Sequence, residues 1–513
     1  MSDTPASDPG ESKGAAANEP VSIRRFIGET AVFGLVDAFG KFLGFVLLPI
    51  TAALLTPADF GILGLFGTTS SIVFIFCSLG LPTTFFRFYS EASDEPSRRK
   101  IIGTAIWSLT AYSAVTLSAL LIFGHSLNQF LFQSNSALFV LAILAYLSCF
   151  DSLGTCKLQA DGKAWTFFWI SITGILVHRG LGLYLIFQNW GAWGWIYAEV
   201  LSMFIMFLLM LGLTFRNLRF TYSVDAAHEM LPYGATLVPV FISSWVMAGC
   251  DKYMIRLLMD DPFAQIGFYS FGENQFDHAT MIIQAFSLGW RRYAFQNMHH
   301  EEGPRLLGKG ISFFVLTTAY AAMGLALLGD DLIHWAISAD YRPGSVVIPS
   351  LTLASLFWGW GEIAGIGFHK AKRTINLAGY NVLAAFLNVA LNFVAIPLFG
   401  ILGAATATFL CQATKTFLIW RKAQRAFFIP LDYPRLAGVG GVLIAVYAIA
   451  FTLGRVAIAR LPDPYGWLTA SSVETVLSLL VLPLLWFSGI LRPEEKTLIV
   501  TWVSKAMNRV RGR

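Results

Sequence analysis

The chain has 513 residues, of which 56% are hydrophobic and 13% are charged, with a mean hydropathy of +0.62 and a net charge of +5. Soluble proteins carry about 25% charged residues, so the polar side chains are too few to cover a soluble protein of this length. The composition excludes a soluble enzyme and indicates a chain that is solvated by a lipid bilayer.

The chain begins with a polar tail. Residues 1–20 consist mainly of small residues, Pro and acidic residues without apolar periodicity, which is typical of a disordered segment and not of a secretory signal peptide. We therefore predict a disordered cytosolic tail over residues 1–28. The apolar stretch over residues 29–55 is too long for the apolar region of a signal peptide and predicts the first membrane helix.

Thirteen further apolar segments have roughly the length that crosses a bilayer. They lie at 61–83, 101–124, 136–156, 165–187, 191–214, 232–258, 265–290, 311–329, 346–367, 374–397, 402–420, 436–455 and 469–490. The chain is therefore predicted to be an all-α polytopic membrane protein with about 14 transmembrane helices. The connections are short, which leaves no room for a folded domain between the helices.

Positive charges are distributed unevenly between alternate connections. Of the 36 Lys and Arg residues, 28 lie in the tails and the even-numbered loops, and five, including Lys252 and Arg256, lie in the odd-numbered loops. Cytosolic loops are enriched in Lys and Arg, so this bias places both termini in the cytosol and favours an even number of helices.

The chain weakly matches itself at an offset of 206 to 209 residues. The matching residues are Gly61 with Gly267, Ser78-Leu79-Gly80 with Ser287-Leu288-Gly289, and Gly191, Gly194 and Ala198 with Gly400, Gly403 and Ala407. An offset of six helices predicts two parallel repeats around a central cavity. The alternative is chance recurrence of small residues, which occur throughout helix bundles.

This repeat divides the chain into parts. Residues 29–214 form a predicted N-lobe of helices 1–6, and residues 232–420 form a predicted C-lobe of helices 7–12. A cytosolic loop, residues 215–231, joins the lobes, and residues 421–490 supply two extra helices. Residues 491–513 place Ile499, Trp502, Val503, Ala506 and Val510 on one helix face with Lys and Arg residues around it, which predicts an amphipathic helix on an anionic membrane surface.

Sites for metals, cofactors or catalysis are not indicated. The five cysteines lie in apolar stretches without a Cys-X-X-Cys pair or a His at ligand spacing, so neither a disulfide framework nor a zinc site is predicted. Residues 303–310 approach the spacing of a phosphate-binding loop but end in Gly310 where Ser or Thr is needed. We therefore expect no cofactor and no enzymatic activity.

Several stretches carry a family resemblance. They are GKFLGFVLLPITAALLTPADFGILGLF at 40–66, SLGLPTTFFRFYSEASDEPSRRK at 78–100, LQADGKAWTFF at 158–168 and DKYMIRLLMDDPFAQIGFYSFG at 251–272. Together they resemble the polysaccharide transporter family of the multidrug/oligosaccharidyl-lipid/polysaccharide (MOP) flippase superfamily. Within the first stretch, Pro57 ends one helix and Asp59 is expected to cap the next.

The resemblance implies a flippase that moves lipid-linked oligosaccharides or polysaccharide repeat units across the cell inner membrane by alternating access. The product would be a cell-surface polysaccharide such as lipopolysaccharide O-antigen, exopolysaccharide or capsule. The implied partners are an undecaprenyl-type lipid-linked oligosaccharide, membrane lipids and a polysaccharide polymerase or export machinery, and no nucleic acid. Such a cargo needs a polar, cation-lined cavity because its pyrophosphate and sugars must cross the hydrocarbon.

Two other functions compete with this interpretation. A multidrug antiporter of the same superfamily would exchange ions for drugs, but such proteins usually have twelve helices. A membrane-embedded glycosyltransferase or polymerase would act on the same lipids, but it normally needs a larger outer loop that carries catalytic groups.

Charged residues inside the predicted helices are the candidate site residues, because charge in the membrane is costly and usually functional. Arg179 lies mid-helix, and its planar guanidinium fits a phosphate or carboxylate with two parallel hydrogen bonds. Lys41 and Lys415 are predicted to assist it in binding the anionic part of the cargo, although Lys415 lies nearer a helix end, where it can extend to the membrane surface.

Four carboxylates are candidates for ion coupling. Asp37 lies four residues before Lys41, so the two side chains share a helix face and can pair. Glu199, Glu273 and Glu362 also fall inside predicted helices. The alternative role for any of the three is a fixed ion pair with Arg179.

Overall fold

The computed structural model describes residues 23–134, 136–215, 221–370 and 375–487. Within these ranges the regular structure is helical. The helices are α1 (Ile23–Leu54), α2 (Pro57–Ser78), α3 (Leu81–Glu91), α4 (Glu95–Phe132), α5 (Ala137–Ala160), α6 (Ala164–Phe187), α7 (Gly191–Leu213), α8 (Val224–Leu258), α9 (Pro262–Asn297), α10 (Gly303–Ala336), the 3₁₀ helix η1 (Ala339–Val347), α11 (Ile348–Ala364), α12 (Ile366–Lys370), α13 (Ile375–Ala426), α14 (Tyr433–Arg460) and α15 (Tyr465–Phe487).

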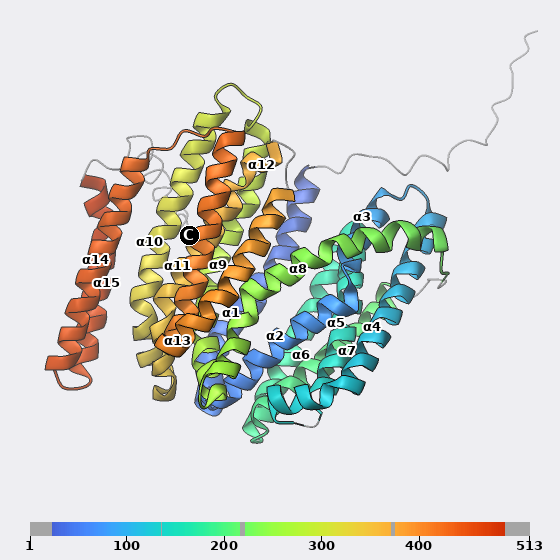
Figure 1. The fold of residues 1–513 in the computed structure, drawn as a ribbon, viewed down its shortest axis with the longest axis horizontal. Coiled ribbons are helices and arrows are strands. Elements are labelled where there is room, and N and C mark those ends of the chain that lie inside the picture. The colour runs from blue at the N-terminus through green and yellow to red at the C-terminus, as the bar shows by residue number, and fades with distance from the viewer. Residues whose placement is uncertain (1–22, 135, 216–220, 371–374, 488–513) are drawn as a thin grey trace, which may run out of the picture.

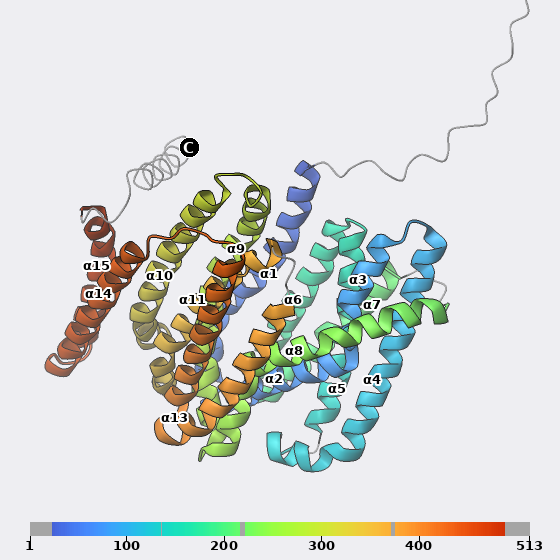
Figure 2. The same cartoon turned by 45° about the horizontal axis from the view of Figure 1, so that its top comes forward.

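The helices form two lobes, as predicted. In Figure 1, α2 to α7 gather on one side and α9 to α13 on the other, while α8 crosses from one group to the other. Helices α14 and α15 stand together at the outer flank of the second group, and the view in Figure 2 agrees. The two extra helices therefore lie beside the C-lobe.

The surface of the helices is apolar. Large apolar side chains are widely exposed, with Phe123 at 78%, Phe386 at 75% and Ile444 at 71%. A soluble protein rarely exposes so much apolar surface, whereas lipid tails solvate it well. Among the described residues, eleven helical segments are long and apolar enough to cross a membrane. The chain is a multi-pass membrane protein, while the count of fourteen spans and the side of the termini stay predictions.

Some predicted boundaries differ from the structure. Helix α1 already begins at Ile23, inside the predicted tail of residues 1–28, and α8 begins at Val224, inside the predicted loop of residues 215–231. Ser223 ends that loop early because its Oγ accepts a hydrogen bond from the Ala226 N–H and so caps α8. The predicted amphipathic tail, residues 491–513, lies outside the described residues.

Two predicted spans, 374–397 and 402–420, are joined within α13. Gly400 breaks that helix with φ of 61° and ψ of −139°, a backbone conformation that only glycine adopts readily. The break turns the chain back, and α13 therefore supplies two antiparallel segments to the C-lobe.

The corner between α1 and α2 is capped as its sequence suggested. Thr56 is the N-cap residue, and its Oγ1 accepts a hydrogen bond from the Asp59 N–H at 3.2 Å. Asp59 accepts a hydrogen bond in return from the Thr56 N–H at 3.0 Å, which completes a capping box. The other oxygen of Asp59 accepts a hydrogen bond from the Ala192 N–H at 3.0 Å. One carboxylate therefore fixes the start of α2 against the start of α7.

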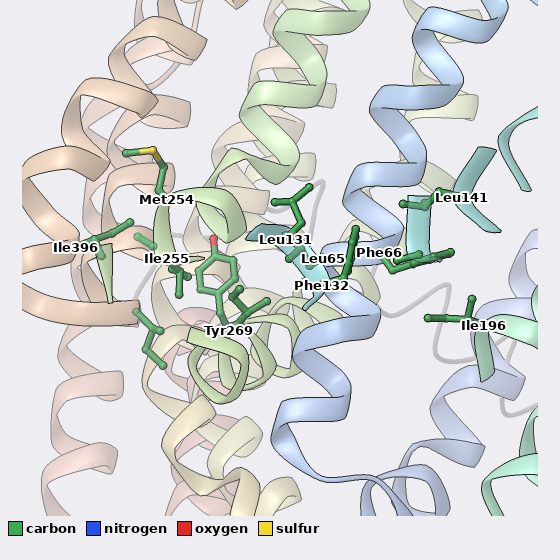
Figure 3. Packing of buried hydrophobic residues seen from close by; sticks show 14 of the residues in the cluster. Leu65, Phe66, Leu131, Phe132, Leu141, Ile196, Met254, Ile255, Tyr269 and Ile396 are labelled. Carbon is green, nitrogen blue, oxygen red and sulfur yellow. The ribbon is translucent and has the colours of Figure 1, made fainter. Parts of the chain in front are cut away.

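Helices α2 and α9, which the repeat relates to each other, cross in close contact. A Cβ added to Gly61 would meet the Phe263 carbonyl oxygen, and a Cβ added to Gly267 would meet the Pro57 carbonyl oxygen. Each glycine thus packs against the backbone that precedes its counterpart. Figure 3 shows the buried cluster beside this crossing, to which Leu65 and Phe66 of α2 and Tyr269 of α9 all belong. The lobes are therefore joined by a symmetric backbone contact and an apolar core.

Candidate substrate cavity

A cavity of about 350 Å³ lies between the lobes beside the α2–α9 crossing. Its walls come from α1, α2, α6, α7, α8 and α9. The charged residues that line it are Lys41, Arg179, Lys252 and Glu273. We call this space the cation cavity, because three cations and one carboxylate surround it.

Arg179 projects from α6 into the cation cavity. Its guanidinium carbon lies 5.2 Å from the ring centre of Trp195, a cation–π distance. Gly44 of α1 leaves room for the guanidinium, because an added Cβ there would lie 3.3 Å from Nη2. Glu199 interacts electrostatically with Arg179, but no carboxylate among the described residues lies within ion-pair distance of it. The guanidinium is therefore held by an aromatic face, which leaves its donors available to an anion.

Lys41 lines the same cavity from α1. Its Nζ lies 3.0 Å from the Asp37 carboxylate one turn earlier, so the pair that the spacing allowed is formed. The Asp37 side chain is 63% exposed, against 29% for Lys41. The structure thus brings Lys41 and Arg179 into one cavity and leaves Asp37 at its edge.

Lys252 is a third cation that the sequence interpretation missed. Counting it in an odd-numbered loop was wrong, because Lys252 lies inside α8 and is 5% exposed. Its Nζ lies 2.5 Å from the Glu273 carboxylate of α9. The sequence could have identified Lys252 as an intramembrane charge, because it lies inside the predicted span 232–258.

Lys415 and Glu362 lie elsewhere. They line a separate cavity of about 480 Å³ within the C-lobe, together with Asp251, Thr408 and Gln412. We call it the C-lobe cavity. Glu273 borders both this cavity and the cation cavity. The structure therefore does not place Lys415 beside Arg179 and Lys41.

Asp251 is a buried carboxylate to which the sequence interpretation gave no role. It is 3% exposed. It accepts hydrogen bonds from the Tyr269 hydroxyl at 2.5 Å, the Thr408 hydroxyl at 2.7 Å and the Asn392 amide at 2.6 Å. These donors come from α9 and from both segments of α13. Asp251 thus links α8 to the rest of the C-lobe. In the sequence, this role was indicated only by the presence of a carboxylate within an otherwise apolar segment.

Comparisons with known proteins agree with this architecture. Residues 50–287 match the model of a family described as polysaccharide biosynthesis protein. Among solved structures, the lipid II flippase MurJ in an inward closed conformation aligns with a TM-score of 0.71 and 13% identity, over 90% of this chain and 100% of that one. The resemblance to the polysaccharide transporter family is confirmed.

Multidrug transporters share the fold at lower similarity. An inward-facing multidrug resistance MATE family transporter of the MOP superfamily aligns with a TM-score of 0.54 and 12% identity, over 76% of this chain and 94% of that one. The MATE multidrug transporter DinF-BH gives a TM-score of 0.54 and 13% identity, over 80% of this chain and 98% of that one. None of the curated proteins matches the sequence significantly. The fold is therefore that of MOP transporters, and at this identity it does not name a substrate.

Proposed function

We propose that the protein is a flippase that carries lipid-linked oligosaccharides across the cell inner membrane for the synthesis of a surface polysaccharide. The observation that carries this proposal is the cation cavity, in which Arg179, Lys41 and Lys252 line one space between the lobes. Such a space suits a diphosphate, which is the anionic group of a polyprenyl-linked sugar. The family match over residues 50–287 supports a polysaccharide pathway.

Each cation has a definite task in this proposal. The Arg179 fork, oriented by Trp195, binds two phosphate oxygens, whereas Lys41 and Lys252 supply point charges. Asp37 and Glu273 keep the two lysines neutralised while cargo is absent, because an unpaired charge inside a membrane protein is costly. Cargo binding then exchanges a carboxylate partner for a phosphate partner. No chemical bond is made or broken, so the proposal includes no enzymatic step.

A drug antiporter is the second candidate, since MATE transporters share the fold. The cation cavity opposes it, because Arg179 has no carboxylate within ion-pair distance among the described residues and would repel a cationic drug. Ion coupling through Asp37, Glu199, Glu273 or Glu362 stays a prediction for either function. A polymerase or export complex on the outer side would receive the flipped product.

The deciding experiment replaces Arg179 by Lys, Gln and Ala in cells that lack the native protein. We expect surface polysaccharide to fall at least tenfold in Arg179→Ala, with Arg179→Lys intermediate, while the amount of protein in the membrane is unchanged. Arg460→Ala is the matched control, because Arg460 is exposed at the end of α14. Normal export by Arg179→Ala at normal abundance would refute the cargo role, and loss of both export and abundance would indicate a structural role.

A further inference from the structure

A larger cavity of about 800 Å³ continues from the cation cavity along α2 and is lined by residues of α2, α3, α5 and α8. Eight of its lining residues carry hydroxyl groups: Thr68, Ser70, Ser71, Ser78, Thr83, Ser148, Ser152 and Ser244. We call it the hydroxyl cavity. Among the described residues that line it, Lys252 is the charged one. The composition of this wall differs sharply from that of the cation cavity.

The two cavities share part of their walls. Leu63, Gly64 and Lys252 line both of them. A single extended ligand can therefore place an anionic group near Arg179 and Lys252 and extend the remainder into the hydroxyl cavity. A lipid-linked oligosaccharide has this order of groups, since its sugars follow directly on the diphosphate.

Two hydroxyl groups on α2 are arranged as acceptors. The Thr68 hydroxyl donates to the Gly64 carbonyl at 2.9 Å, and the Ser71 hydroxyl donates to the Gly67 carbonyl at 3.0 Å. Each has used its one donor within the helix, while its oxygen keeps lone pairs that can accept. Sugar hydroxyls supply many donors, so this wall complements an uncharged sugar and offers little to an anion.

Trp245 adds an aromatic wall that is held in place. Its Nε1–H donates to the Thr68 carbonyl at 2.8 Å, and its ring contacts the Tyr253 ring at a centroid distance of 5.5 Å. Aromatic faces carry partial negative charge and attract C–H groups with partial positive charge, which line the faces of a pyranose ring. A fixed indole is therefore suited to pack against a sugar.

We propose that the hydroxyl cavity is the subsite for the uncharged sugar residues of the cargo, adjoining the anion in the cation cavity. The volume of about 800 Å³ lies within the ~300–1,000 Å³ that is typical of small-molecule sites. This inference rests on the proposed function and adds to it the class of glycan that the protein accepts, one whose first sugars are neutral.

Gly67 offers a way to fill the subsite without disturbing the fold. It lines the hydroxyl cavity, and an added Cβ would meet no atom within 4 Å. A Gly67→Leu side chain would therefore project into the cavity. Gly212 of α7 has equally open surroundings but does not line the cavity, so Gly212→Leu is the matched control. Trp245→Ala is a second, independent variant that removes the aromatic wall.

The test compares two probes on the purified full-length protein in lipid nanodiscs by titration calorimetry. One probe is farnesyl pyrophosphate, and the other is the same lipid pyrophosphate bearing a tetrasaccharide of neutral hexoses. We expect the native protein and Gly212→Leu to bind the glycosylated probe at least tenfold more tightly than farnesyl pyrophosphate. Gly67→Leu and Trp245→Ala should lose this advantage and keep the native affinity for farnesyl pyrophosphate.

The outcomes separate the two proposals. The sugar subsite would be overturned if Gly67→Leu and Trp245→Ala preferred the glycosylated probe over farnesyl pyrophosphate as strongly as the native protein does. It would also be overturned if the native protein bound the two probes equally tightly. Farnesyl pyrophosphate binding that is absent, or that is unchanged by Arg179→Ala, would instead overturn the proposed function and this inference with it. A melting temperature within the native range in Gly67→Leu shows that the loss is not due to unfolding.

Discussion

The ion pair between Lys252 and Glu273 stands where the cation cavity meets the C-lobe cavity. Lys252 is 7% exposed and Glu273 24% exposed at the side-chain level. A pair this far from water is sensitive to the loss of one partner, since the remaining charge is poorly solvated. Glu273 thus both neutralises Lys252 and competes with any anion for it.

Replacing Glu273 by Gln should therefore tighten the binding of an anionic probe. We expect Glu273→Gln to bind farnesyl pyrophosphate about fivefold more tightly than the native protein, which corresponds to roughly 1 kcal/mol. Titration of the purified protein measures the change. Glu229→Gln, at an exposed position of α8, is the matched control. Weaker or unchanged binding by Glu273→Gln would show that Lys252 does not contact the anion.

At the scale of single residues, the sequence predicted some of the cavity residues and missed others. Charge inside apolar segments identified Lys41 and Arg179, because a charged residue in a membrane helix is costly and usually functional. It did not separate them from Lys415, since helix positions along the chain do not tell which cavity a side chain enters. Lys252 was assigned to a loop because its neighbours Asp251 and Arg256 made the end of that helix look polar.

At the scale of helices, the α2–α9 crossing is a site of very close packing. Gly61 and Gly267 each abut a backbone carbonyl of the other helix, and a carbonyl cannot move aside as a flexible side chain can. Small residues allow such close approach of membrane helices, where packing and not hydrophobicity drives association.

A methyl group at this crossing should therefore force the helices apart. We expect Gly61→Ala and Gly267→Ala each to lower the stability of the lobe contact by about 1–3 kcal/mol, the usual cost of overpacking. Thermal unfolding of the purified protein in detergent measures it. Gly379→Ala provides the control, since an added Cβ at Gly379 meets no atom within 4 Å. An unchanged melting temperature in both crossing variants would contradict a rigid contact.

Helix positions were largely predictable, and their ends were not. Runs of apolar residues marked the spans, and Thr56-Pro57-Ala58-Asp59 marked a helix start through its capping chemistry. The extension of α8 back to Val224 was missed because its first turns lie at the polar edge of the lobe, where hydropathy gives no signal. The predicted repeat paired Gly61 with Gly267, but nothing in the sequence indicated that the helices carrying them cross in close contact.

At the scale of the whole molecule, the predicted topology makes a direct experiment possible. The protein has five cysteines, four of them buried, so a cysteine-free background can be built with few changes. Single cysteines can then replace exposed residues in the connections between helices.

We expect Gln188→Cys and Asp340→Cys to react with a membrane-impermeable maleimide in intact cells, because both lie in predicted outer loops. Lys163→Cys and Glu301→Cys should react only after the membrane is opened, since they lie in predicted cytosolic loops. These four residues are exposed in the structure. Reaction of two consecutive loops from the same side would contradict the predicted topology.

The two-lobed architecture was accessible from the sequence because duplication and loop charge are properties of the chain as a whole. The tilt of α8 across the lobes, seen in Figure 1, was not accessible. The tilt of a membrane helix depends on which neighbours it packs against. The hydropathy of the sequence predicts only the length of the helix. For the same reason the different chemistry of the cation, hydroxyl and C-lobe cavities had to come from the structure.

Asp251 and Lys252 are neighbours in sequence, yet they line different cavities. Adjacent residues on an α-helix point about 100° apart. A turn of α8 about its own axis by that angle would withdraw an ammonium group from the space between the lobes and present a carboxylate in its place. Because Arg179, Lys41 and Glu273 would stay in place, the charged side chains around that space would change from three cations and one carboxylate to two of each. The rotational setting of one helix therefore tunes how strongly the space attracts a negatively charged solute.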